Sequence, residues 1–126
     1  MPKATYRQDA GLHGETLACE ELARRGYAIL ERRYRTRFGE IDIVATEAGM
    51  LVFVEVKARK TIDYGDAAST IPLWKRRRIA AMALDYLAWF DRLEAPCRFD
   101  VVAIDGLGTR RQRIEVIPDA FVVDGR

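Results

Sequence analysis

Two carboxylates and a lysine lie on neighbouring stretches that both have the pattern of β-strands. The first stretch, GEIDIVA, contains Asp42, and the second, LVFVEVKAR, contains Glu55 and Lys57. Both are rich in β-branched residues, and Gly49 between them favours a tight turn. A hairpin centred on this turn would set Asp42 directly opposite Glu55.

The same register predicts which side chains share each face of the hairpin. Val44 and Phe53 would lie on the face of Asp42, and Glu40 would pair with Lys57. The other face would pair Ile41, Ile43 and Ala45 with Val56, Val54 and Val52. Two facing carboxylates repel each other unless a cation lies between them. Two interpretations remain open, namely solvated salt-bridge partners or a divalent-metal site for phosphodiester hydrolysis.

Four segments, taken together and in order, resemble a known family. They are GLHGE near the start, GEIDIVA, LVFVEVKAR and RFDVVAI. Over about residues 11–121 they resemble the uncharacterised bacterial YraN-like family, which is itself similar to archaeal Holliday-junction resolvases. Asp42 followed by Glu55-Val56-Lys57 also matches the D…(D/E)-x-K signature of restriction-endonuclease-like nucleases. The resemblance implies an α/β fold with an αβββαβ core, in which a mixed central sheet is flanked by helices.

The resemblance also implies a role for each residue of the site. Asp42, Glu55 and the backbone carbonyl of Val56 would hold Mg²⁺ or Mn²⁺. Glu15, in the first helix, would complete the metal site. Lys57 would orient or help deprotonate the attacking water. From the sequence alone, Glu15 has a second interpretation as a favourable charge near a helix N-terminus.

Basic residues gather around this acidic pair, although the net charge of the chain is only +2. A single basic cluster is typical of a solvated face, but several flanking one acidic pair indicate a phosphate-binding channel. We expect Arg59, Lys75, Arg35 and Arg37 to contact nucleic acid, with DNA favoured over RNA. The four clusters are Arg32, Arg33, Arg35 and Arg37; Lys57, Arg59 and Lys60; Lys75–Arg78; and Arg110, Arg111 and Arg113.

Length and composition predict one domain over residues 1–126. Hydrophobic residues make up 49% and charged residues 32%, as in ordinary globular proteins. No apolar run approaches the roughly 20 residues that span a membrane, and the first residues lack an export signal. We therefore expect no membrane partner and a cytoplasmic location. Cys19 and Cys97 are expected to be free thiols, and His13, the only histidine, excludes a two-histidine site.

Hydrophobic periodicity and turn residues predict the elements that must position these side chains. In the first predicted strand, Arg33 would share a face with Ile29, and Arg32 with Tyr34. Trp74 and Trp89 are expected to be buried, and Ser69 or Thr70 is expected to cap the second helix. The predicted elements are a helix over 9–25, a strand over 27–35, the hairpin over 39–59, a loop over 60–69, a helix over 71–93, a strand over 98–105, and an edge strand over 113–117 that Pro118 ends.

Together these patterns predict a metal-dependent endonuclease that acts on structured or branched DNA, of the kind used in repair or recombination. The resolvase resemblance implies a homodimer. A second interpretation is a nucleic-acid-binding module that keeps the nuclease fold without turnover. A third is a structural or partner-binding protein whose basic patches aid solubility. The presence of all four residues of the implied site favours the first interpretation.

Overall fold

The computed structural model describes residues 6–61 and 71–122 of the chain. It contains two helices and five strands in the predicted order, a helix, three strands, a helix and two strands. Most of the predicted loop, residues 62–69, lies outside the described residues. The second helix begins at Leu73 with Pro72 at its N-cap position and no side-chain cap hydrogen bond, so the prediction that Ser69 or Thr70 caps it is wrong. The elements are α1 (Tyr6–Arg24), β1 (Ala28–Thr36), β2 (Gly39–Glu47), β3 (Met50–Ala58), α2 (Leu73–Trp89), β4 (Cys97–Asp105) and β5 (Arg113–Phe121).

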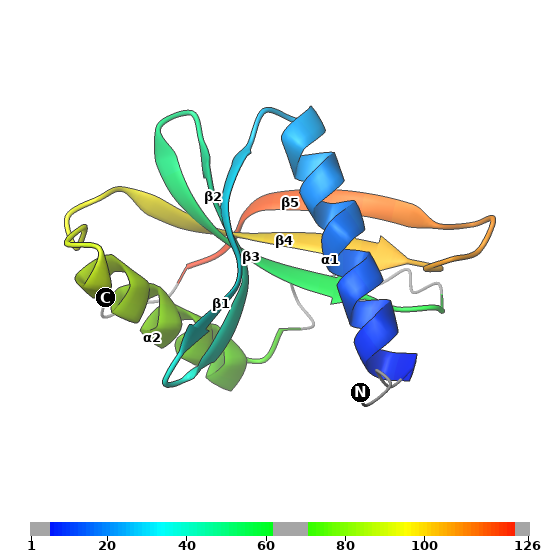
Figure 1. The fold of residues 1–126 in the computed structure, drawn as a ribbon, viewed down its shortest axis with the longest axis horizontal. Coiled ribbons are helices and arrows are strands. Elements are labelled where there is room, and N and C mark those ends of the chain that lie inside the picture. Colours follow the sequence, from blue (N-terminus) through cyan, green and yellow to red (C-terminus); the bar gives the residue numbers. More distant parts are fainter. Residues whose placement is uncertain (1–5, 62–70, 123–126) are drawn as a thin grey trace, which may run out of the picture.

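The five strands form one mixed sheet in the order β1-β2-β3-β4-β5. Strands β3 and β4 are parallel, because helix α2 carries the chain back between them, and the other neighbours are antiparallel. The helices α1 and α2 pack against opposite faces of the sheet (Figure 1). The structure confirms the predicted α/β class with a mixed sheet flanked by helices.

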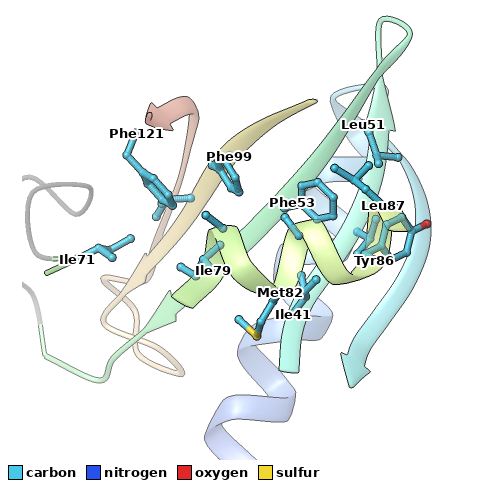
Figure 2. Packing of buried hydrophobic residues seen from close by; sticks show 14 of the residues in the cluster. Ile41, Leu51, Phe53, Ile71, Ile79, Met82, Tyr86, Leu87, Phe99 and Phe121 are labelled. Atoms are coloured by element: carbon cyan, nitrogen blue, oxygen red, sulfur yellow. The ribbon is translucent and has the colours of Figure 1, made fainter. Parts of the chain in front are cut away.

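Each helix covers its own apolar core. On the α2 side, Tyr86 lies at the centre and packs edge-to-face on Phe53 and Tyr34, with ring centroids 5.6 and 5.0 Å away. Figure 2 shows Ile79, Met82 and Tyr86 of α2 lying over the strands that carry Phe53 and Phe99. On the other face, the core beneath α1 contains Ala18, Leu22, Val52, Val54, Val102 and Ile104.

The β2–β3 hairpin confirms the predicted turn and most of the predicted register. Ala48 and Gly49 both have positive φ, 53° and 78°, which is the conformation of the turns that join two-residue hairpins. Ile43 pairs with Val54, and Ala45 pairs with Val52. The described pairing ends at Ile43 and Val54, so Asp42 and Glu55 lie just beyond the last paired residues.

One prediction about the faces of β2 is wrong. Ile41 was expected to share a face with Ile43, but Ile41 belongs to the core under α2 and Ile43 to the core under α1. The change of side coincides with Arg33 on the neighbouring strand, which lies between the partners of these two residues and has φ of 54°. A left-handed residue interrupts the alternation of side chains that a regular strand would keep.

Strand β5 is longer than predicted. It continues through Pro118 to Phe121, which is buried and stacked on Phe99 with centroids 5.1 Å apart. Proline is tolerated here because β5 is an edge strand, where a missing N–H breaks no interior ladder. A register shift and the positive φ of Asp119, 51°, return the chain to the sheet.

The expected burial of Trp74 and Trp89 is also wrong. They are 63% and 78% exposed. Both lie in the end turns of α2, outside the stretch from Ile79 to Leu87 that packs on the sheet. Neither α2 nor α1, the two helices in the described part of the chain, is long and apolar enough to cross a membrane.

Candidate functional site

Helix α1 approaches strand β3 very closely at Gly14. A Cβ atom placed on Gly14 would lie 2.7 Å from the Cβ of Ala58, which is closer than two carbon atoms can pack. Only glycine therefore permits this approach. The contact fixes the position of the next residue, Glu15, whose side chain is buried against the sheet with the whole residue 6% exposed.

Replacing Gly14 with alanine is expected to lower the free energy of unfolding by about 1–3 kcal/mol, the usual cost of overpacking, because neither clashing atom can swing away. Gly11 provides a matched control on the same helix, since a Cβ there meets nothing within 4 Å. Gly11→Ala should instead stabilise the protein by about 0.5–1 kcal/mol. Urea unfolding of both variants measures the difference. Equal stabilities would contradict the close approach at Gly14.

Asp42 lies where β2 and β3 cease to pair, and its side chain replaces a ladder bond. The backbone N–H of Val56 donates to Oδ2 of Asp42 at 2.8 Å. The pKa of Asp42 is raised to about 7, mainly by burial and next by the nearby Glu55 carboxylate. Glu15 acts in the same direction, whereas the Val56 hydrogen bond and Lys75 oppose it. Glu55 and Glu15, from two other elements, are therefore both within electrostatic reach of Asp42.

Glu55 pairs with a lysine that α2 supplies. Nζ of Lys75 lies 2.8 Å from Oε1 of Glu55, and the two side chains are only 29% and 13% exposed. Lys57 is partly buried, two residues further along β3, so strand alternation places it on the same face as Glu55. The structure thus brings two lysines to the side of the sheet on which Glu55 lies.

Glu15 also has a basic partner, which the sequence prediction missed. Nε of Arg33 donates to both carboxylate oxygens of Glu15, at 3.0 and 3.2 Å. The neighbouring Arg32 donates to Thr16 of the same helix at 3.2 Å. Arg32 and Arg33 thus both reach α1, and the prediction that they lie on opposite faces of β1 is wrong. The left-handed φ of Arg33 causes the difference.

The other predicted phosphate contacts lie away from this cluster or are held by acids. Nε of Arg59 is 2.8 Å from Asp105, at the ends of β3 and β4. Arg35 and Arg37 are exposed beside the β1–β2 turn. Arg35 pairs with Glu40 at 3.0 Å, and Arg37 lies 3.8 Å from Asp85 and 5.1 Å from the ring of Phe38. Glu40 is therefore a surface salt-bridge partner of Arg35.

Asp100 is fully buried but belongs to a structural network. It accepts hydrogen bonds from Tyr27 at 2.7 Å, from Nε of Arg98 at 2.9 Å and from the backbone N–H of Asp119 at 2.9 Å. Arg98 extends the network to Glu47 at 2.9 Å. Every oxygen of this carboxylate has partners, so its role is to hold β4, β5 and the start of β1 together.

The side chains around Asp42 offer oxygen atoms of the type that a hard divalent cation binds. The candidate ligands are the carboxylates of Asp42, Glu55 and Glu15 and the Val56 carbonyl, which are all oxygen ligands. Within residues 6–61 and 71–122, no three or more His, Cys, Asp or Glu side chains are already arranged to hold an ion. Mg²⁺ needs no such cage, because it usually takes one or two carboxylates, several waters and substrate phosphate. The residues present therefore suit Mg²⁺ or Mn²⁺ better than Zn²⁺.

Comparisons with known proteins place the chain in a family. The model of uncharacterised protein family UPF0102 matches residues 14–104. A UPF0102 protein of Roseiflexus castenholzii is 49% identical over 90% of this chain and 94% of its own length. UPF0102 proteins of Anaeromyxobacter dehalogenans and Rhodococcus opacus are 44% and 45% identical, over 95% and 88% of this chain and 89% and 94% of their own lengths. The chain therefore belongs to uncharacterised protein family UPF0102, which confirms the uncharacterised bacterial family that its four segments predicted.

Proposed function

We propose that this protein is a metal-dependent endonuclease that hydrolyses phosphodiester bonds in structured or branched DNA, with a restriction-endonuclease-like site. The observation that carries the proposal is the carboxylate cluster at the end of the β2–β3 pairing. Asp42 is partly buried there and lies near Glu55, and burial first and repulsion by Glu55 second raise the pKa of Asp42 to about 7. Such an arrangement destabilises the metal-free protein and favours binding of a divalent cation.

Asp42, Glu55 and the Val56 carbonyl would hold Mg²⁺ or Mn²⁺, and Glu15 would complete the metal site. The ion would lower the pKa of a water molecule and offset the negative charge that builds on the scissile phosphate. The Val56 N–H fixes the orientation of Asp42, because it holds Oδ2 at 2.8 Å. This hydrogen bond is the positioning element of the site.

Lys57 and Lys75 have separate tasks in the proposed mechanism. The Lys57 ammonium would hold the attacking water by hydrogen bonding and stabilise the charge of the pentavalent phosphate. Lys75 pairs with Glu55 across the space between β3 and α2. When a cation takes over the charge of Glu55, the ammonium of Lys75 becomes available to a DNA phosphate. Arg59, anchored by Asp105, would contact a neighbouring phosphate.

The direct test is a panel of end-labelled DNA substrates with the purified protein. The panel includes duplex, single-stranded, flapped and four-way-junction DNA, each with EDTA, Mg²⁺ or Mn²⁺. We expect cleavage only with Mg²⁺ or Mn²⁺, and most of it on substrates that contain a branch. If every substrate remains intact with both ions, the nuclease proposal is wrong. Sedimentation of the protein with and without a junction tests the proposed homodimer in the same samples.

A second candidate is a nucleic-acid-binding module without turnover. It is favoured by the fact that Arg33 and Lys75 already neutralise Glu15 and Glu55 without any metal. In this case DNA binding should be independent of Mg²⁺ and should weaken steeply with salt, since phosphate contacts release counterions. Binding that is absent, or insensitive to salt, would leave only a structural or protein-binding role.

A further inference from the structure

An exposed tryptophan precedes Lys75, the partner of Glu55, in the chain. Trp74 is 63% exposed in the first turn of α2, and the preceding Leu73 is 57% exposed. A tryptophan side chain that remains in solvent forgoes a large gain from burial, so an exposed aromatic patch is a frequent mark of a binding surface. Trp74 contributes nothing to the apolar core, which starts at Ile79 on this helix.

The surroundings of Trp74 are strongly basic. The guanidinium of Arg78 lies over the indole ring, 5.4 Å from its centroid. Lys75, Arg76 and Arg77 follow directly in the chain, and no acidic residue lies in the first turn of the helix. Cations in the first turn oppose the helix dipole and so reduce the stability of the helix. This sequence therefore suits a ligand with both an aromatic face and a negative charge.

The position of Trp74 identifies the ligand more closely. Lys75, its neighbour in the chain, lies 2.8 Å from Glu55, so the backbone that carries the indole also carries the partner of this carboxylate. A nucleotide bound with its phosphate near the carboxylate cluster would carry its base toward the first turn of α2. Single-stranded nucleic acid combines the required features, since its bases stack on aromatic rings while Lys and Arg neutralise its phosphates.

We infer that Trp74 is a stacking platform for an unpaired base, and that the exposed Arg77 and Arg78 hold the neighbouring phosphates. The location next to the cleaved bond rests on the proposed function, but the binding itself does not. Bases inside a duplex are stacked on each other and hidden from the indole. The platform therefore selects DNA with a single-stranded or unpaired stretch.

The second exposed tryptophan of α2 provides a matched control. Trp89 is 78% exposed in the last turn, roughly 20 Å from Trp74 at the helical rise of about 1.5 Å per residue. Its neighbours in the chain are the exposed apolar residues Phe90 and Leu93 rather than a run of cations. Loss of Trp89 removes the same side chain from the same helix and leaves the basic turn unchanged.

Fluorescence anisotropy with a labelled single strand and the matching duplex, in EDTA so that nothing is cleaved, tests the inference. Trp74→Ala should weaken binding of the single strand by about 5- to 100-fold, the usual effect of losing one base–aromatic stack. Duplex binding should change less than about threefold. Trp89→Ala should bind both ligands like the unmodified protein, and Trp74→Phe should retain most of the single-strand affinity. In a Trp89→Phe protein, the single strand should quench the emission of Trp74, and the duplex should not.

Several outcomes would overturn the inference. The inference is wrong if Trp74→Ala leaves the affinity for the single strand unchanged or weakens the binding of both ligands equally. It is also wrong if Trp74→Ala weakens single-strand binding no more than Trp89→Ala does. If Trp74→Ala instead lowers the sedimentation coefficient of the DNA-free protein, Trp74 contacts a second copy of the chain. Each result is independent of cleavage. If the protein cleaves nothing but Trp74→Ala selectively loses single-strand affinity, the stacking platform is supported and the nuclease proposal is wrong. If the protein cleaves DNA but Trp74→Ala keeps its single-strand affinity, the nuclease proposal is supported and the stacking platform is wrong.

Discussion

Asp42→Asn is expected to reduce Mg²⁺-dependent cleavage by at least about 10²–10³-fold, the cost of losing one preorganised group that stabilises developing charge. Asparagine keeps an oxygen that can accept the hydrogen bond from the Val56 N–H, now 2.8 Å long, but it cannot supply an anionic ligand. The fold and the shape of the site should therefore remain. The measurement is the single-turnover rate on the best substrate of the panel, with the dissociation constant for the same DNA measured in EDTA.

Glu40→Gln is the matched control for this prediction. Glu40 lies two residues before Asp42 on the same strand, and its carboxylate pairs with the exposed Arg35 at 3.0 Å. Neutralising it removes the same charge without touching the cluster, so the rate should change by no more than about twofold. If both variants cleave at the rate of the unmodified protein, Asp42 is not part of the catalytic site. If both lose activity equally, the effect comes from the net charge of β2 rather than from metal binding.

The parts of the fold that follow from local sequence were predictable. A period of two with β-branched residues identified β2 and β3, and the Ala48-Gly49 pair fixed their turn, so that the pairing of Ile43 with Val54 followed by counting. The apolar stripe from Ile79 to Leu87 identified α2 in the same way. These patterns depend only on residues near one another in the chain.

The features that the sequence did not reveal depend on contacts between distant segments. Arg33 was assigned to a regular strand, but its left-handed conformation turns the side chain to Glu15, eighteen positions earlier in the chain. No periodic pattern in the sequence predicts a residue with a left-handed conformation. Counting back from the β1–β2 turn would have placed Arg33 opposite Asp42, because Arg32 and Tyr34 pair with Ile43 and Ile41. That register was the one available signal for a basic residue at the site.

Lys75 and its neighbour Trp74 show the same limit of prediction from local sequence. The sequence placed Lys75 in a basic cluster expected to contact nucleic acid, and the structure pairs it with Glu55. What could not be predicted was that the helix brings an exposed Trp74 with it. A tryptophan near an apolar stripe usually packs, and only the end of the packed stretch at Ile79 shows that this one does not.

The stability of the metal-free protein is expected to fall as the pH rises from about 4 to about 7. The pKa of Asp42 is raised from its ordinary value of 3.8 to about 7, first by burial and then by Glu55. In this interval the folded protein holds a proton that the unfolded chain has released, so the free energy of unfolding decreases with increasing pH. The difference between the two pKa values corresponds to at most about 4 kcal/mol, fully lost above pH 7.

Asp42→Asn separates this contribution from the other titrating groups. Since asparagine does not ionise, the variant should be more stable than the unmodified protein above pH 7 and should lose that advantage near pH 4. Urea unfolding in EDTA between pH 4 and 8.5 measures the difference between the two curves. Parallel curves would mean that Asp42 titrates at its ordinary value and that the carboxylates do not repel each other in the folded protein.

A divalent cation should offset the loss of stability that ionised Asp42 causes at high pH. This expectation links the stability of the protein to the proposed function. A cation that binds only the folded protein at one hundred times its dissociation constant stabilises it by about 2.7 kcal/mol. At pH 8, Mg²⁺ or Mn²⁺ should therefore restore much of the stability that ionised Asp42 and Glu55 remove, and should add nothing to the Asp42→Asn variant. Equal stabilisation of both proteins would mean that the ion binds elsewhere. If neither protein is stabilised, the repulsion between Asp42 and Glu55 does not mark a metal site.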